Sequence, residues 1–113
     1  MRRGEVWLIN LDPTVGSEIR KTRPAIIVND DAVGILPLRV IVPITAWQDR
    51  YAVAPWMVRI EPDAENGLDK PSAADAFQVR SVSQTRFVRM LGNVSAQTLH
   101  DIARALAIVL SIP

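Results

Sequence analysis

The chain has 113 residues, 49% of them hydrophobic, and we predict one domain over residues 1–113 with enough apolar side chains for a core. It contains no cysteine, which excludes disulfides, thiol catalysis and cysteine-ligated metals. The formal net charge of +1 is too small to identify a nucleic-acid binder, so such a function would depend on where individual charges lie.

Apolar runs in the sequence are too short for a membrane span. The longest, near the C-terminus, is interrupted by Arg104. Arg2 and Arg3 are followed by Gly4 and Glu5 and not by the apolar core of a signal peptide. We therefore expect a cytoplasmic protein that does not contact a membrane.

The first two predicted strands, Glu5–Leu11 and Ala25–Val28, are joined by a loop rich in charge. Pro24 ends this loop and restricts Arg23 to extended backbone, which holds the arginine in place. A fixed guanidinium near Glu18, on a loop between core strands, indicates a site for an anionic substrate.

The third predicted strand, Leu38–Thr45, contains Pro43, which predicts an edge strand or a bulge near Thr45. Further along the chain we expect three more strands, Trp56–Ile60, Ala76–Ser83 and Arg89–Val94, and a loop or helical turn at Pro71–Ala74.

The last predicted element is an amphipathic helix of about four turns with Ser95 as its N-cap. One face is expected to pack on the core, and it is formed by Leu99, Ile102, Ala103, Leu106, Val109 and Leu110. His100 falls outside this face and is predicted to be solvated. The pattern predicts a mainly β (α+β) fold, a small, strongly bent antiparallel sheet or partial barrel with a C-terminal helix.

Several kinds of catalytic chemistry have no support in the sequence. There is no phosphate-binding glycine loop, and His100 is the only histidine. The carboxylates lack the paired spacing of metal ligands, so neither a metal nor a cofactor is expected. Catalysis would have to come from arginine, a carboxylate and hydroxyl groups.

Those groups are suited to RNA cleavage, because RNA carries its own nucleophile, the 2′-OH. Attack of this hydroxyl on the adjacent phosphate needs one proton removed, one supplied, and negative charge stabilised on the phosphoryl oxygens. Glu18 is a candidate base, and guanidinium and hydroxyl donors would stabilise the charge. The proton donor stays unassigned, because the pKa of an arginine is too high.

A family resemblance rests on three N-terminal blocks, Gly4-Glu5-Val6-Trp7, Asp12-Pro13-Thr14-Val15-Gly16-Ser17-Glu18 and Lys21-Thr22-Arg23-Pro24-Ala25. Their order resembles the signature of the MazF/PemK (Kid) toxins, a family of endoribonucleases. Later landmarks follow in sequence, namely Val42–Thr45, Gln78–Arg80 and Arg89–Gly92.

The resemblance implies an SH3-like small β-barrel of five to seven short strands with a C-terminal amphipathic helix, assembled as a homodimer. It implies a growth-inhibiting toxin that cleaves single-stranded mRNA at a short sequence without a metal, leaving a 2′,3′-cyclic phosphate and a 5′-OH. It also implies a cognate antitoxin, whose tail covers the RNA groove and which forms a DNA-binding complex with the toxin.

The resemblance assigns catalytic roles to Arg23, Thr45 and Glu18. Residues expected to contact RNA are the loop cations and positions on later strands, namely Arg20, Lys21, Gln78, Arg80 and Arg86. The sequence departs from the family pattern at Phe77, where an acidic residue usually precedes the glutamine, and Asp75 lies two residues earlier.

Two other functions stay open at the level of sequence. A toxin like CcdB would have a similar barrel and would bind a topoisomerase without cleaving RNA, because fold does not determine function. A degenerate relative would bind RNA or an antitoxin without catalysis. The presence of both Arg23 and Thr45 favours the nuclease.

Overall fold

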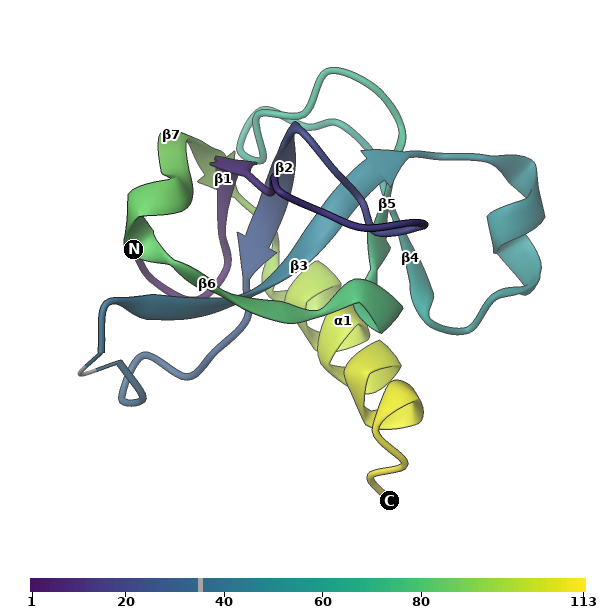
Figure 1. Ribbon diagram of the computed structural model, residues 1–113. Helices are drawn as coiled ribbons and strands as arrows, with labels where there is room; N and C mark the ends of the chain where they lie inside the picture. Colours follow the sequence, from purple (N-terminus) through teal and green to yellow (C-terminus); the bar gives the residue numbers. More distant parts are fainter. Residues whose placement is uncertain (35) are drawn as a thin grey trace.

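Residues 1–34 and 36–113, which the computed structural model describes, form seven strands, three 3-10 turns and one C-terminal helix (Figure 1). In chain order these elements are β1 (Glu5–Asn10), β2 (Thr22–Ile27), β3 (Leu38–Ala46), η1 (Asp49–Val53), β4 (Met57–Ile60), β5 (Ser72–Asp75), η2 (Ala76–Gln78), β6 (Arg80–Ser83), η3 (Gln84–Arg86), β7 (Phe87–Asn93) and α1 (Ala96–Val109). The predicted mainly β fold with a C-terminal helix is confirmed.

The strands form one antiparallel sheet in the order β4-β5-β3-β2-β1-β7, and β6 pairs with β3 beyond the end of β5. No hydrogen-bonded ladder joins β7 to β4 or β6 within the described residues, so the bent sheet is not closed. This arrangement is compatible with the predicted barrel-like fold, and the centre of the sheet is β3.

The central position of β3 overturns the first of the two alternatives predicted from Pro43, an edge strand. The second alternative was an irregularity near Thr45, and on one side the pairing of β3 is interrupted between Ile41 and Ile44. Pro43 is aligned with Ala25 of β2, and Val28 N donates to Val40 O at 2.9 Å in the same register. In antiparallel pairing this alternation directs the nitrogen of Pro43 away from β2. On that side η2 interrupts the pairing of β3 with β5 and β6, so no ladder bond is lost.

Two apolar clusters lie on opposite faces of the sheet. The first packs against α1 and contains Val6, Ile26, Val28, Val42, Ile44, Ile60, Ala74 and Ile102. The second contains Ile9, Leu11, Ala25, Ile27, Ile41 and Val82. Strand alternation explains the division, because even-numbered residues of β2 and β3 face α1 and odd-numbered residues face the opposite side.

The helix α1 begins as predicted, since the Ser95 hydroxyl accepts a hydrogen bond from Thr98 N at 3.1 Å. Ile102 and Ala105 are buried against the sheet. The expectation that Leu110 belongs to the buried face is wrong, because α1 ends at Val109 and Leu110 is 59% exposed. None of the helices in the described part of the chain has the length and apolar character needed to cross a membrane.

The segment between residues 71 and 83 also differs from expectation. Ser72–Asp75 is a buried strand and not a loop or helical turn, because it pairs with both β3 and β4. Ala76–Gln78 is a 3-10 turn, so the strand expected to begin at Ala76 begins only at Arg80. Asp75 caps this turn by accepting a hydrogen bond from Phe77 N at 3.1 Å.

Candidate functional site

Arg23 and Thr45 lie on neighbouring strands at the edge of the second apolar cluster. The β2–β3 ladder ends with Ala25 aligned with Pro43, and Arg23 and Thr45 each lie two residues beyond that pair on their strands. Both residues have odd numbers and so share the face of the sheet opposite α1. The strand register therefore brings together two residues that lie 22 positions apart in the sequence.

The polar groups of Arg23 and Thr45 are largely unoccupied. Arg23 is exposed, and its Nε donates to Arg20 O at 3.3 Å. Among the described residues, its terminal nitrogens make no hydrogen bond or ion pair, and the half-buried Thr45 hydroxyl makes no hydrogen bond. Both side chains can therefore donate hydrogen bonds to an anion placed between them.

Glu18 shapes the loop between β1 and β2. Its Oε1 accepts a hydrogen bond from Val15 N at 2.7 Å, and its backbone N donates to Val15 O at 3.3 Å. No ion pair joins Glu18 to Arg23 in the described part of the chain. The carboxylate is exposed and stabilises the turn with one oxygen, which leaves the other open to solvent.

Gln78 fastens the far end of this loop to η2. Its Oε1 accepts from Ile19 N at 2.6 Å, and its Nε2 donates to Ser17 O at 3.4 Å and to Asp75 Oδ2 at 3.2 Å. The predicted RNA contact is not tested by these bonds, but both ends of the amide are engaged within the protein.

Asp75 is a part of the site that sequence reasoning missed. The turn η2 brings its carboxylate back to Gln78, three residues later, although Phe77 occupies the position directly before the glutamine. Burial raises the pKa of Asp75, while hydrogen bonds from Phe77 N and Gln78 act in the opposite direction. The only sequence signal for this contact is that Asp75 and Gln78 are three residues apart. That spacing alone does not predict a 3-10 turn between them.

Arg80 and Arg86 hold the beginning of the same loop. Arg80 Nη1 donates to Leu11 O at 3.2 Å, and Arg86 Nη1 donates to Asn10 O at 3.2 Å and also to Asp12 O. Both arginines are half-buried. Their guanidinium groups therefore fix the backbone where β1 ends and the loop begins.

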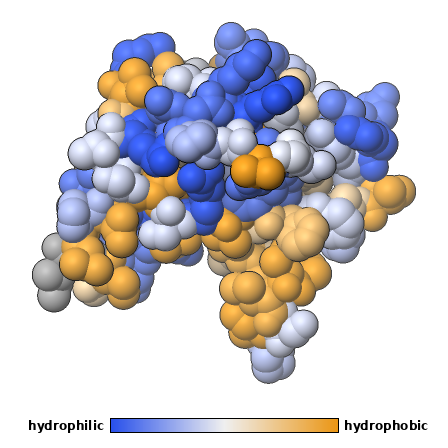
Figure 2. Space-filling view, in the orientation of Figure 1, coloured by the Kyte–Doolittle hydropathy of each residue, from blue (hydrophilic) through white to orange (hydrophobic). Residues whose placement is uncertain are grey.

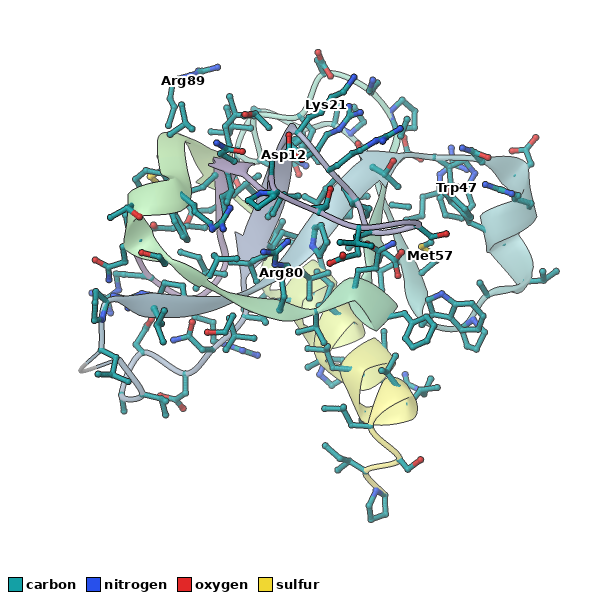
Figure 3. All side chains as sticks on the ribbon, viewed as in Figure 1. Asp12, Lys21, Trp47, Met57, Arg80 and Arg89 are labelled. Carbon is teal, nitrogen blue, oxygen red and sulfur yellow. The ribbon has the colours of Figure 1, made fainter. Side chains whose placement is uncertain are left out.

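The other two loop cations, Arg20 and Lys21, are exposed at the return of the loop to β2. Lys21 has a positive φ of 68°, and its N donates to Asp12 Oδ1 at 3.1 Å while its O accepts from Leu11 N at 2.9 Å. These bonds close the base of the loop. In the view of Figure 3, Lys21 and Asp12 lie close together near the top of the molecule and Arg80 lies lower.

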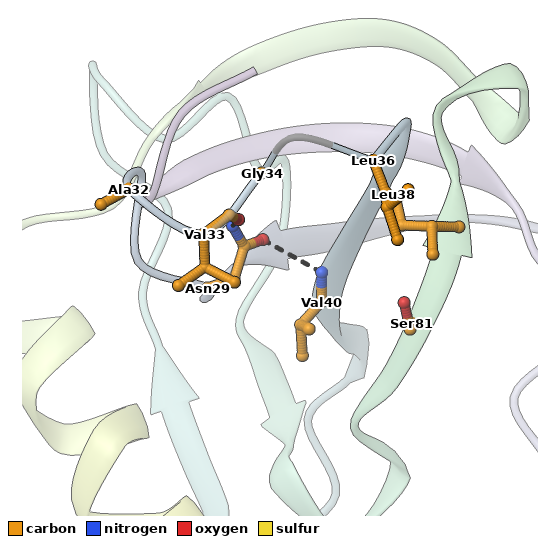
Figure 4. A pocket seen from close by; sticks show the side chains of 8 residues that line it. All are labelled: Asn29, Ala32, Val33, Gly34, Leu36, Leu38, Val40 and Ser81. Carbon is orange, nitrogen blue, oxygen red and sulfur yellow. Dashed lines mark hydrogen bonds between the residues drawn. The ribbon is translucent and has the colours of Figure 1, made fainter.

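Loop residues that the structure describes line two hollows of interest. One, of about 470 Å³, is open between the β1–β2 loop and η2 and is lined by Val15, Ser17, Glu18, Phe77, Gln78 and Val79. The other, of about 490 Å³, lies beside the connection between β2 and β3 and contains none of the predicted site residues (Figure 4). Its described lining is mainly apolar and includes no charged side chain. The first hollow therefore adjoins the predicted site.

Metal-binding groups were sought among all described residues. They include no group of three or more histidine, cysteine, aspartate or glutamate side chains placed to hold a metal ion. His100 is exposed on α1, as predicted. The site offers the Arg23 guanidinium and the Thr45 hydroxyl as hydrogen-bond donors, and the Glu18 carboxylate on the adjoining loop as an acceptor.

Comparison with known proteins places these observations in a family. Residues 2–110 match the family model described as PemK-like, MazF-like toxin of type II toxin–antitoxin system. Endoribonuclease MazF9 of Mycobacterium tuberculosis is 35% identical over 118 residues, covering 99% of this chain and 98% of that protein.

Solved structures show the same fold. MazF from Deinococcus radiodurans has a TM-score of 0.82 at 23% identity, covering 98% of this chain and 96% of that one. A mycobacterial endoribonuclease in complex with its cognate antitoxin has a TM-score of 0.79 at 23% identity, and the match covers 100% of this chain and 97% of that one. The likeness extends along almost the whole of each chain.

Proposed function

This chain belongs to the PemK-like, MazF-like family of type II toxins, and we propose that it is the endoribonuclease of a toxin–antitoxin pair. The observation that carries the proposal is the 35% identity to an endoribonuclease over nearly the full length of both chains. The cross-strand placement of Arg23 and Thr45 supports it, because both can donate to one phosphate.

The proposed reaction begins with attack of a 2′-OH on the adjacent phosphorus of single-stranded RNA. The O2′–P bond forms as the P–O5′ bond breaks, which yields a 2′,3′-cyclic phosphate and a 5′-OH. A proton leaves the 2′-OH and another reaches the departing 5′ oxygen. Arg23 and Thr45 donate hydrogen bonds to the non-bridging oxygens, where negative charge increases in the transition state.

Glu18 is proposed to accept the proton of the 2′-OH. One of its oxygens is held by Val15 N, which fixes the carboxylate while the second oxygen faces solvent. We assign the proton delivered to the 5′ oxygen to water.

The remaining site residues are proposed to act on RNA in two ways. Arg20 and Lys21 are exposed and contribute phosphate contacts that weaken with salt. Gln78, Arg80 and Arg86 donate to backbone carbonyls of the β1–β2 loop and act mainly by holding it in position. RNA contact by these three residues stays a prediction.

Assembly is proposed to involve an antitoxin protein and a second copy of the chain, in the cytoplasm. A related endoribonuclease was solved with its cognate antitoxin. The end of α1 projects from the sheet with a largely hydrophobic surface (Figures 1 and 2), where Ile108 and Leu110 are 54% and 59% exposed. Sedimentation as a monomer at micromolar concentration would count against the homodimer.

The experiment that tests the proposed function is incubation of the purified protein with a long unstructured RNA in EDTA, followed by mapping of the new ends. We expect cuts at one short sequence, each with a 5′-OH. Cutting by a contaminant would persist in an Arg23→Ala preparation purified in parallel. No cutting by folded protein free of antitoxin would favour a binding toxin or an inactive relative.

A further inference from the structure

The row of residues that contains Thr45 continues across the sheet to Arg59. Thr45 of β3 is aligned with Ala73 of β5, and Ala73 is aligned with Arg59 of β4. Directly opposed residues of antiparallel strands point to the same face. Thr45, Ala73 and Arg59 are therefore aligned across three strands, and Arg23 lies two residues beyond the last aligned pair of β2 and β3.

Arg59 is held in a fixed orientation on an aromatic ring. Its guanidinium carbon lies 4.9 Å from the centre of the Trp47 ring, and its Nε donates to Glu61 Oε1 at 2.5 Å. Trp47 follows Thr45 by two residues, and its backbone N donates to Pro71 O at 3.0 Å. The Arg59 side chain nevertheless stays 47% exposed.

A second ring and a second arginine extend this arrangement onto η1. The Tyr51 ring meets Trp47 edge to face, with centroids 5.8 Å apart and an interplanar angle of 83°. The guanidinium carbon of Arg50 lies 5.4 Å from the centre of the Tyr51 ring. In Figure 3, Trp47 lies between the end of β3 and η1. Two aromatic rings and two arginines thus form a cluster beside the proposed catalytic pair.

We propose that Arg59, stacked on Trp47, is a base-stacking platform for a nucleotide adjacent to the cleaved bond. Planar guanidinium groups and aromatic rings are the surfaces on which proteins stack unpaired RNA bases. Two strand spacings, about 10 Å, separate Arg59 from Thr45, a distance that a neighbouring nucleotide spans. The inference rests on the proposed function, because it takes single-stranded RNA as the substrate.

A bound protein is the alternative occupant of this cluster. RNA is favoured because Arg59 is aligned with Thr45 through Ala73, which puts the cluster within one nucleotide's reach of a phosphate held by Arg23 and Thr45.

The test combines removal of the arginine with removal of the base. The substrates are an RNA oligonucleotide spanning a mapped cut and two copies in which the base on one or the other side of the cut is replaced by an abasic ribose. The proteins are wild type, Arg59→Ala, Arg59→Lys, and Arg89→Ala as a control for loss of an exposed arginine on the distant strand β7. The measurement is kcat/KM in EDTA, with thermal unfolding of each variant.

We expect Arg59→Ala to lower kcat/KM about five- to a hundredfold, chiefly through KM, and Arg59→Lys to recover little because lysine has no planar face. For wild type, one of the two abasic substrates should have a similarly lower kcat/KM than the intact oligonucleotide. For Arg59→Ala, kcat/KM should be the same on that abasic substrate and on the intact oligonucleotide. Arg89→Ala should cleave like wild type. The non-additive loss is the signature of a contact between that base and Arg59.

Two results would overturn the proposal. The first is that folded Arg59→Ala and Arg59→Lys cleave the intact oligonucleotide as fast as wild type. If those variants also lose antitoxin binding, the cluster binds a protein partner and not RNA. The other is independent, multiplicative losses from the arginine and the base. An inactive wild-type protein would instead show that the proposed function itself had failed.

Discussion

The strand residues and the loop-supporting residues of the site differ in what their polar groups contact. Arg23 and Thr45 stand on β2 and β3, and among the described residues most of their donor groups have no partner. Gln78 and Arg86 come from later in the chain and direct their donors to backbone carbonyls of the β1–β2 segment. The first pair is positioned by strand register and is open to substrate, whereas the second pair forms the support of a loop.

This difference separates two ways in which a substitution can lower activity. Loss of an unoccupied donor should slow the chemical step and leave stability nearly unchanged. Loss of a donor already bound to a buried or half-buried backbone group should destabilise the protein and loosen the loop. The predictions below test this comparison, beginning with the largest expected effect.

The largest effect should come from the substrate. Replacing the single ribose before the cleaved phosphate by deoxyribose removes the nucleophile, and cleavage there should fall below detection. Binding should remain within about twofold, because the phosphate contacts are retained. The measurement is single-turnover cleavage together with fluorescence anisotropy of the labelled oligonucleotide. Continued cutting at the deoxyribose would contradict attack by the 2′-OH.

Thr45→Val removes the hydroxyl while keeping the β-branched shape that suits the strand. We expect the cleavage rate to fall about ten- to a hundredfold, as for removal of one donor to a developing charge. Thermal unfolding should change little, because the hydroxyl makes no hydrogen bond within the described residues. A Thr45→Ser variant is the matched control and should retain most of the activity. Equal rates for Thr45→Val and wild type would remove this residue from the mechanism.

Gln78→Ala should affect the loop before it affects the chemistry. The change leaves Ile19 N and Asp75 Oδ2 without their side-chain partner and should cost about 1–2 kcal/mol of unfolding free energy. We expect about a tenfold loss of kcat/KM and faster hydrogen exchange of the Ile19 amide. An equal loss of activity with unchanged exchange would indicate that Gln78 contacts RNA directly.

Much of the fold follows from local patterns in the sequence. Alternating and β-branched residues predict β1 to β4, and Ser95 with its apolar stripe predicts α1. The strand β5 was missed because Ser72–Asp75 has no β-branched or aromatic residue, and its burial comes from pairing with β3 and β4 on either side. Tertiary pairing decides the structure of that segment.

The position of Arg23 on a strand was predictable, whereas its role in the site stays a prediction. Arg23 was expected to be held by Pro24, and β2 does include it. The support given by Arg86 to Asn10 and Asp12 joins residues more than 70 positions apart, so no local pattern reveals it. Asp75 was noted only as an acid displaced from its usual place, because its contact with Gln78 depends on the turn η2.

The smallest effect should appear in the pH dependence of stability. Burial raises the pKa of Asp75 above its ordinary value of 3.8 in the folded protein, so the unfolded chain releases this proton first as pH rises. The unfavourable burial of ionised Asp75 therefore lowers the free energy of unfolding as pH rises above the pKa of the unfolded chain. In acid, where Asp75 is protonated in both states, this loss of stability disappears. Asp75→Asn should gain stability relative to wild type as pH increases from about 4 to 7, measured by urea unfolding. A difference in unfolding free energy between Asp75→Asn and wild type that stays constant with pH would contradict this.

The account is tested most directly by comparing two arginines of the site, Arg23 and Arg86, as alanine variants in single-turnover cleavage and urea unfolding. Arg23→Ala should lower the cleavage rate at least a hundredfold with little change in stability. Arg86→Ala should lose about 0.5–1.5 kcal/mol of stability, because its guanidinium bonds to Asn10 O and Asp12 O, which water can reach once the arginine is removed. The folded variant should lose less than about tenfold in cleavage rate. Retained activity in Arg23→Ala, or a hundredfold loss in a fully stable Arg86→Ala, would contradict the division of the site into a catalytic pair and a supporting group.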